Sequence, residues 1–263
     1  MESSPVAILL HGASGRMGAS IRSLIPKIEG VRLRGVLKLR DSGADMGMPY
    51  PEGVAILRAV PKTSAPGDVV IDFSHPTALV ALLEALMGSG LPLVCGTTGL
   101  QAAERELLEV YSKESPVFYE ENMSYGISVL KKLLHLAAPL LVESSDVEVV
   151  EYHHRGKADF PSGTALMLAD LLAPGSRVVT GRGEFAHPAR TAEERLHVHS
   201  VRLGGIAGQH DIHFGLDDEV VTLSHRALSR DVFARGAIRA AQFVANKNKG
   251  FFAMSDLLGA KDG

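Results

Sequence analysis

The chain has 263 residues, of which 46% are hydrophobic and 22% charged, and its formal net charge is −3. This length allows two domains that each bury a core, and the composition is that of a folded protein, not a disordered one. The small acidic excess gives no electrostatic basis for nucleic-acid binding, and no membrane span is implied. The single cysteine, Cys95, excludes an internal disulfide and fits a reducing compartment. We therefore expect a cytoplasmic protein in which Cys95, within an apolar run, is buried.

The first predicted unit is a strand, a glycine-rich turn and a helix. The apolar run Val6–Leu10 predicts a strand buried on both faces, and residues 19–25 have the apolar spacing of a helix. Between them, Gly12, Gly15 and Gly18 lie where a dinucleotide-binding fingerprint requires close backbone approach, although Ala13 occupies a position that is usually glycine. This context indicates a dinucleotide site.

The residue after the second predicted strand, Val31–Leu37, bears on the choice of dinucleotide. About twenty residues past the glycines, an NAD site usually has an acidic residue for the ribose hydroxyls, but this chain has Lys38. A cation there favours a 2′-phosphate, and Arg16 in the glycine loop can share that charge. We therefore expect NADPH as the preferred cofactor, with NADH as the second choice. The alternative is that Lys38 and Arg40 are solvated loop residues.

Strands and helices alternate along the next part of the chain. After a loop-rich segment, residues 41–66, strands are predicted at 69–73, 91–95 and 117–119, and helices at 77–87 and 101–112. This alternation predicts an α/β fold with a Rossmann-like, doubly wound parallel sheet. Ligands of such sheets lie beyond the carboxyl ends of the strands. The residues expected there are His75, Thr97, Thr98 and residues 120–123.

A seventeen-residue stretch, 148–164, combines several groups suited to acid–base chemistry. A predicted strand ends at His153 and His154, whose side chains should point to opposite sides. Residues 161–164 then open an apolar helix, and a helix start with Lys157 nearby suits a carboxylate or phosphate. We expect an anionic substrate beside a titratable histidine. The alternative is a solvated His-His loop and a simple helix cap.

Strands with alternating apolar residues dominate after residue 164, at 197–202, 211–214 and 220–225. They predict a second α+β domain with an open mixed sheet, one face of which is available to a partner subunit. A helix at 233–245 and an apolar segment at 250–258 should return to the first domain. We therefore expect residues 1–124 and 235–263 to form the dinucleotide-binding domain, and residues 125–234 to form the substrate-binding and oligomerisation domain.

The eleven histidines raise the question of a metal site. His197 and His199 lie on one side of a strand, but no cysteine or carboxylate stands at a convincing ligand spacing around them, so we expect no metal site. His210 and His225 are expected to be structural or to line a pocket wall.

Several motifs together resemble one enzyme family over nearly the whole chain. They are Gly12–Gly18, Val70–Ser74, Gly96–Gly99, Asn122–Ser124 with Gly126, Glu151–Ala165 and Ser229–Ala234. The chain resembles the dihydrodipicolinate reductases, now called 4-hydroxy-tetrahydrodipicolinate reductases, of the diaminopimelate route to lysine. The resemblance implies reduction of a small dicarboxylate by NADPH or NADH, in a homotetramer associated through the second-domain sheet.

The resemblance also implies roles for individual residues. His153 would be the acid/base and Lys157 the proton donor, and the substrate carboxylates would be held by His154, Ser162, Gly163 and Thr164. The residues expected at the cofactor are Gly12, Ala13, Ser14, Gly15, Arg16, Met17, Lys38, Gly96, Thr97, Thr98, Glu120, Glu121, Asn122 and Met123.

One departure from the resemblance leaves alternatives open. Glu120 and Glu121 stand where most relatives have small or apolar residues, and two carboxylates there would repel a dianionic substrate unless they turn away or pair with cations. One alternative is a related reductase of another imine or enamine acid, which these glutamates and Tyr125 would fit. The other is a non-catalytic dinucleotide sensor, which the presence of His153 and Lys157 disfavours.

Overall fold

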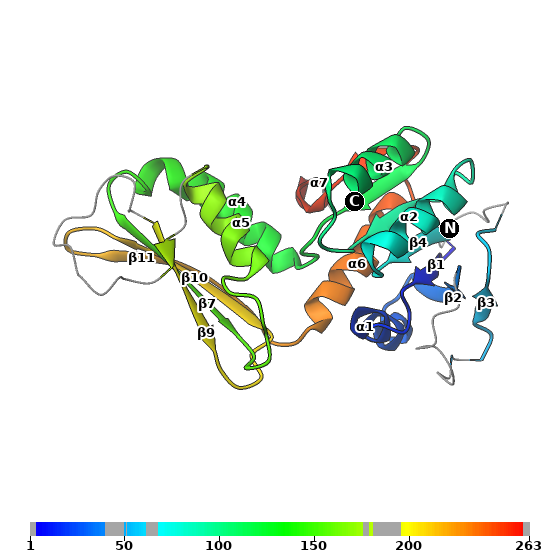
Figure 1. Cartoon of the computed structure of the whole chain (residues 1–263), viewed down its shortest axis with the longest axis horizontal. Coiled ribbons are helices and arrows are strands. Elements are labelled where there is room, and N and C mark those ends of the chain that lie inside the picture. The colour runs from blue at the N-terminus through cyan, green and yellow to red at the C-terminus, as the bar shows by residue number, and fades with distance from the viewer. Residues whose placement is uncertain are drawn as a thin grey trace. The chain divides into compact units, whose positions relative to one another are not determined.

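The computed structural model describes residues 4–39, 50, 52–61, 68–175, 179–180 and 196–259. The chain divides into two compact units, residues 1–124 with 231–263, and residues 125–230 (Figure 1). Residues 231–234, which we expected in the second domain, belong to the first unit. They form the start of helix α6 (Asp231–Val244). Because the whole helix packs in the first unit, its first residues belong to that unit too.

The first unit contains a seven-stranded sheet with the order β12-β6-β5-β4-β1-β2-β3. Every pairing in it is parallel. The strands are β1 (Val6–His11), β2 (Val31–Leu37), β3 (Ala55–Leu57), β4 (Asp68–Asp72), β5 (Leu93–Cys95), β6 (Pro116–Tyr119) and β12 (Gly250–Phe252). The predicted parallel sheet is confirmed, and the C-terminal segment completes it by pairing with β6.

Helices pack on both faces of this sheet (Figure 1). Ile8 and Leu10 of β1 face a core that includes α1 (Arg16–Leu24) and α6, whereas Leu9 faces a core with α2 (Pro76–Leu86) and α3 (Ala102–Ser112). A 3₁₀ turn, η1 (Ile25–Lys27), follows α1, and α7 (Met254–Gly259) follows β12. Neighbouring apolar residues of one strand therefore serve two cores, as in a doubly wound fold. Cys95 is buried in the second core, as expected.

The second unit is a five-stranded mixed sheet with the order β11-β10-β7-β9-β8. Its strands are β7 (Asp146–His153), β8 (Val179–Thr180), β9 (Leu196–Arg202), β10 (Gly208–Gly215) and β11 (Val220–Ala227). Strand β7 runs antiparallel to β10 and parallel to β9. Two helices, α4 (Tyr125–Leu141) and α5 (Gly163–Leu172), pack on one face of the sheet (Figure 1).

The alternation along β7 shows which face the helices cover. Val147 and Val149 are buried in the core with α4 and α5, and Glu151 and His153 continue that face. Glu148, between them, points to the opposite face and is partly exposed. The expected open mixed sheet is thus confirmed.

Most expected elements match the observed ones to within a few residues. The apolar pattern of residues 128–141 predicts a helix, and the observed helix α4 begins three residues earlier, at Tyr125. The helix expected at 233–245 spans Asp231–Val244. Much of the loop-rich segment 41–66 lies outside the described residues. Among the helices that the structure describes, none is long and apolar enough to cross a membrane.

Candidate functional site

The glycine turn after β1 is shaped by close backbone contacts. Gly12 has φ +78°, and a Cβ added there would lie 2.2 Å from the Phe73 carbonyl oxygen. A Cβ on Gly18 would lie 2.3 Å from the carbonyl oxygen of Gly12, which accepts a hydrogen bond from the Gly15 N–H at 3.1 Å. Only glycine fits at Gly12 and Gly18, so the turn brings bare backbone to the start of α1.

A pocket of about 330 Å³ lies over this turn. Its lining combines residues 11–15 with Lys38 at the end of β2 and with Ser74 and His75 beyond β4. The structure therefore brings together the predicted phosphate loop and the predicted cation. The Nζ atom of Lys38 also lies 5.2 Å from the centre of the Tyr50 ring.

Two residues expected at the cofactor, directly after Gly15, are not among the residues that line this pocket. Arg16 and Met17 form the first turn of α1, and the described lining does not include them. Arg16 is exposed, and Met17 packs against the core under the helix.

A buried polar network connects the carboxyl ends of β1, β4 and β5. Nδ1 of His11 is 2.6 Å from one carboxylate oxygen of Asp72, and the Thr97 hydroxyl donates to the other at 2.6 Å. The Ser74 N–H donates to the same hydroxyl at 2.9 Å. The Thr97 side chain is therefore committed to the protein and sets the loop shape, a role that the sequence did not reveal.

The loop after β5 contains two other expected cofactor residues. A Cβ on Gly96 would lie 2.3 Å from the Phe73 ring, so glycine is required for that ring to pack there. Thr98, unlike its buried neighbour Thr97, is exposed and leaves its side chain to solvent or ligand.

Glu120 and Glu121 both have partners within the first unit. Glu121 accepts hydrogen bonds from Arg105 at 2.9 Å and from the Tyr119 hydroxyl at 3.0 Å. Burial and the charge of Glu121 raise the pKa of Tyr119, which keeps its hydroxyl protonated as a donor. Glu120 accepts the Met254 N–H at 3.3 Å. The two carboxylates are thus satisfied locally, which weakens the argument for a different substrate.

The next two residues of that segment differ from each other in exposure. Asn122 is partly exposed and its side-chain oxygen accepts the Ser124 N–H at 3.0 Å. Met123 is 1% exposed and packs in the first core, which leaves only its backbone for contact with a ligand.

In the second unit, a buried carboxylate orients His153. Nδ1 of His153 is hydrogen-bonded to Oε2 of Glu151, two residues earlier on the same face of β7. Arg202 of β9 donates to both oxygens of Glu151, at 3.0 and 2.8 Å. The Ser162 N–H reaches Glu151 at 3.3 Å, so the carboxylate also connects β7 to the start of α5.

The protonation state of Glu151 follows from these contacts. Burial alone would raise its pKa, but hydrogen bonds from His153, Arg202 and Ser200 outweigh burial and lower the pKa to about 2. Glu151 is therefore a carboxylate at neutral pH. An ionised acceptor at Nδ1 fixes the N–H on that nitrogen and leaves Nε2 as the reactive atom of His153.

Two residues of β10 surround the His153 ring. A Cβ on Gly208 would lie 3.1 Å from Nε2 of His153, so glycine leaves space at that atom. The His210 ring stands edge-on to His153, with centroids 5.4 Å apart. Burial and the neighbouring His153 lower the pKa of His210 to about 4, so His210 is neutral at physiological pH.

The loop from β7 to α5 holds the remaining predicted residues. Nζ of Lys157 is 2.8 Å from both oxygens of Asp159, and the hydrogen bond from Lys157 lowers the pKa of that carboxyl. Nε2 of His154 accepts from Arg230 at 2.7 Å. His153 and His154 thus have different partners, as expected for side chains that leave a strand in opposite directions.

The start of α5 is a conventional cap. The Ser162 hydroxyl accepts the Ala165 N–H at 3.2 Å and also lies 3.4 Å from Nε2 of His210. Gly163 and Thr164 form the first turn, where N–H groups point out of the helix. His153, Ser162 and His210 are therefore neighbours, and the catalytic and carboxylate-binding groups predicted from the stretch 148–164 occur in one unit.

Sequence reasoning missed several supporting residues. The principal ones are His11, Asp72, Glu151, Arg202, Gly208 and Arg230. The contact of Glu151 with His153 could have been predicted, because residues two positions apart on a strand share a face. The others come from distant parts of the chain.

Comparison with known proteins agrees with this geometry. A family model described as the N-terminus of dihydrodipicolinate reductase matches residues 6–123, and the model of its C-terminus matches residues 126–258. The chain belongs to the dihydrodipicolinate reductase family. These are oxidoreductases that use a nicotinamide cofactor, which fits the pocket over the glycine turn.

Curated relatives match over almost their full length. The 4-hydroxy-tetrahydrodipicolinate reductase of Wolinella succinogenes is 41% identical over 256 residues, which cover 95% of this chain and 98% of the relative. That of Clostridium novyi is 35% identical over 258 residues, covering 97% and 99%. A solved dipicolinate-bound dihydrodipicolinate reductase from a Paenisporosarcina species shares the fold, with a TM-score of 0.75 at 23% identity and coverage of 96% and 99%.

Proposed function

We propose that this protein reduces 4-hydroxy-tetrahydrodipicolinate to tetrahydrodipicolinate on the diaminopimelate route to lysine. The substrate gains a hydride and a proton and loses its hydroxyl group as water, while NADPH or NADH becomes oxidised. The observation that carries the proposal is the Glu151–His153 pair beside the start of α5, in a chain that matches the reductase family from end to end.

The dicarboxylate is held by charge and by backbone donors in the second unit. The first turn of α5, with Gly163 and Thr164, offers N–H groups and the positive end of the helix dipole to one carboxylate. Arg230 donates to Nε2 of His154, which leaves the N–H of His154 at Nδ1 as a donor. The backbone N–H groups of Gly163 and Thr164 bind a carboxylate without adding a second titrating base.

His153 and Lys157 transfer the protons of the reaction. Glu151 keeps the His153 N–H on Nδ1, so Nε2 can accept a proton and later return it. Lys157 carries a positive charge beside Asp159 and supplies a proton to the ring carbon next to the reduced one. When bound, the nicotinamide supplies the hydride.

The pocket of the first unit supports dinucleotide binding because it lies over a turn tight enough to require glycine at Gly12 and Gly18. This turn leads into the start of α1, where backbone N–H groups suit a phosphate. Lys38 in the same pocket favours the 2′-phosphate of NADPH over the ribose of NADH. We propose NADPH as the preferred cofactor and NADH as a weaker one.

The face of the second sheet that no helix of its own unit covers supports the association of subunits. Helices α4 and α5 cover the other face, and Val220, which points to the open face from the edge strand β11, is 64% exposed. We propose a homotetramer associated through this sheet, in a cytoplasmic enzyme without nucleic-acid or membrane partners. Light scattering coupled to size exclusion tests the assembly, and a monomer would refute it.

The reaction is tested by forming the substrate in place from pyruvate and aspartate semialdehyde with the preceding enzyme of the pathway. Loss of reduced-nicotinamide absorbance that depends on this protein is the expected result, and it should be faster with NADPH. Tight cofactor binding without turnover would contradict the proposal and favour a relative with another substrate or a sensor.

A further inference from the structure

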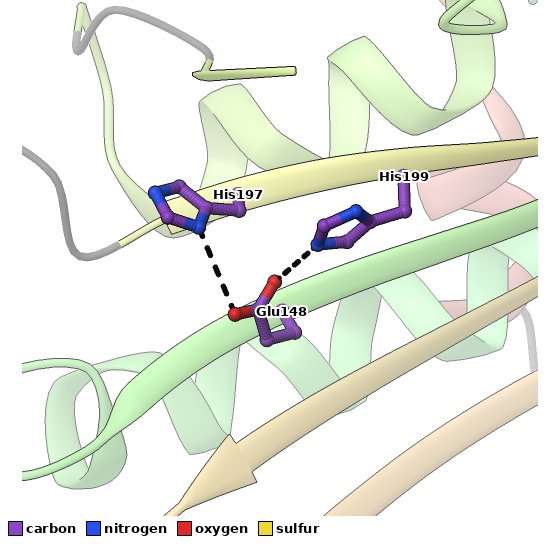
Figure 2. A group of neighbouring side chains, drawn as sticks. All are labelled: Glu148, His197 and His199. Carbon is purple, nitrogen blue, oxygen red and sulfur yellow. Dashed lines mark hydrogen bonds and ion pairs between the residues drawn. The ribbon is translucent and has the colours of Figure 1, made fainter. Parts of the chain in front are cut away.

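A second group of metal-ligating side chains lies away from the residues discussed so far. His197 and His199 on β9 point to the same side, and Glu148 of the neighbouring strand β7 lies directly beside His197 in the parallel register (Figure 2). Oε2 of Glu148 is 2.6 Å from Nε2 of His199, and Oε1 is 3.7 Å from Nδ1 of His197. Sequence spacing did not reveal this carboxylate, because strand pairing brings it to the histidines.

The cluster has dimensions close to those of a metal site. One ligand atom from each of the three residues lies within 4.8 Å of the other two. Around tetrahedral zinc, bonds of about 2.0–2.1 Å place ligand atoms about 3.3 Å apart. A change of roughly 1.5 Å at the side-chain ends therefore converts the cluster into a ligand set. Small χ rotations provide this change without moving the strands.

The surroundings of the cluster suit a bound ion. In the single chain the side chains of His197, Glu148 and His199 are 9%, 24% and 34% exposed, so the ligands are partly desolvated. They lie on the sheet face through which we propose that the subunits associate. All three come from paired strands, which hold their Cβ atoms in place. The His197 and His199 rings are 6.3 Å apart and almost perpendicular, and a nitrogen atom of each ring faces the Glu148 carboxylate (Figure 2).

This cluster is separate from the predicted substrate residues of the same unit. Glu148 points to the open face of the sheet, whereas Glu151 and His153 on the same strand point to the face covered by α4 and α5. A ligand at Glu148 therefore has no contact with the acid–base pair.

We propose that Glu148, His197 and His199 bind one divalent transition-metal ion of the zinc class per chain, with water at the remaining position. Two imidazoles and one carboxylate favour zinc-like ions over magnesium or calcium, which prefer oxygen ligands. The ion cross-links β7 to β9 and stabilises the folded state.

The proposal is tested by titrating Zn²⁺ into chelator-treated protein, without substrate or cofactor, in a calorimeter. The wild type should bind one ion per chain and melt at a higher temperature with the ion present. Glu148→Gln and His199→Gln should each weaken binding by roughly 10-fold or more and abolish the thermal shift. The matched control is His135→Gln, because His135 is an exposed histidine on α4, which covers the opposite face of the sheet, and this variant should bind like the wild type.

Two results would overturn the proposal. One is a wild type that binds no ion at this stoichiometry, and the other is equal affinity in the wild type and both cluster variants. Co²⁺ absorption of the wild type gives a second measurement that needs no variant, since imidazole coordination produces visible bands and their absence contradicts the site. Binding is measured apart from turnover, so failure of the reductase assay leaves this test unaffected.

Discussion

Nδ1 of His153 is hydrogen-bonded to the buried carboxylate of Glu151, and the two residues lie on one face of a single strand. Arg202 bonds to both oxygens of the same carboxylate from the neighbouring strand. The orientation and the tautomer of His153 are thus fixed before any substrate binds. We regard Glu151 as a positioning residue that acts through His153.

Replacing Glu151 with glutamine tests that role. A glutamine amide can donate to Nδ1, which moves the N–H of His153 to Nε2 and removes its acceptor. We expect Glu151→Gln to lower kcat by about 10²-fold or more, with a changed pH profile and nearly unchanged NADPH affinity. Asp170→Asn, on the exposed side of α5, is the control and should keep full turnover. If turnover falls only in proportion to the fraction of unfolded protein, Glu151 has a structural role instead.

Lys157 is the predicted proton donor, and its ammonium group is held by Asp159. We expect Lys157→Ala to lower turnover by orders of magnitude, because the proton source is lost, while NADPH binding in the first unit stays the same. Steady-state kinetics and a fluorescence titration of NADPH measure the two quantities. Equal loss of both would mean that Lys157 supports the structure.

Lys38 lines the pocket over the glycine turn and is expected to select the cofactor. Lys38→Glu should shift the ratio of kcat/KM values from NADPH toward NADH, since a carboxylate repels the 2′-phosphate and accepts from the ribose hydroxyls. Lys113→Glu changes the same charge at the exposed end of α3 and should leave the ratio as it was. An unchanged ratio in both variants removes Lys38 from the cofactor site.

His210 makes the stability of the second unit depend on pH. Burial lowers its pKa from 6.5 to about 4, so between these values the unfolded chain binds a proton that the folded chain does not. This contribution is fully present above pH 6.5 and is lost as the pH falls, by about 2 kcal/mol near pH 5. The free energy of unfolding, measured with denaturant at several pH values, should therefore fall more steeply with decreasing pH in the wild type than in His210→Gln. Parallel curves for the two proteins would contradict this assignment.

The fold was largely predictable because its signals are local. The strand, turn and helix around Gly12, Gly15 and Gly18, and the alternation of strands and helices to residue 119, follow from short-range patterns. The start of α4 at Tyr125 was missed, although Ser124, directly before it, is a residue type that favours the N-cap of a helix. The pairing of β12 with β6 depends on contact between residues more than 130 positions apart.

The site was predictable only where its residues are consecutive. The stretch that contains His153, Lys157 and Ser162 is contiguous, so its chemistry could be inferred from one segment. Arg202 reaches Glu151 across a strand pairing, and Asp72 reaches His11 and Thr97 in the same way. Such partners depend on register, which sequence patterns specify poorly.

In the proposed reaction the nicotinamide hydride is transferred to the substrate ring while the protein supplies the proton. The most direct measurement uses NADPH with deuterium at the transferred position, in ordinary water, with the substrate formed in place and the product examined by mass spectrometry. We expect one deuterium atom on a ring carbon of tetrahydrodipicolinate in each product molecule. Product without deuterium, or oxidation of NADPH without this product, would contradict it.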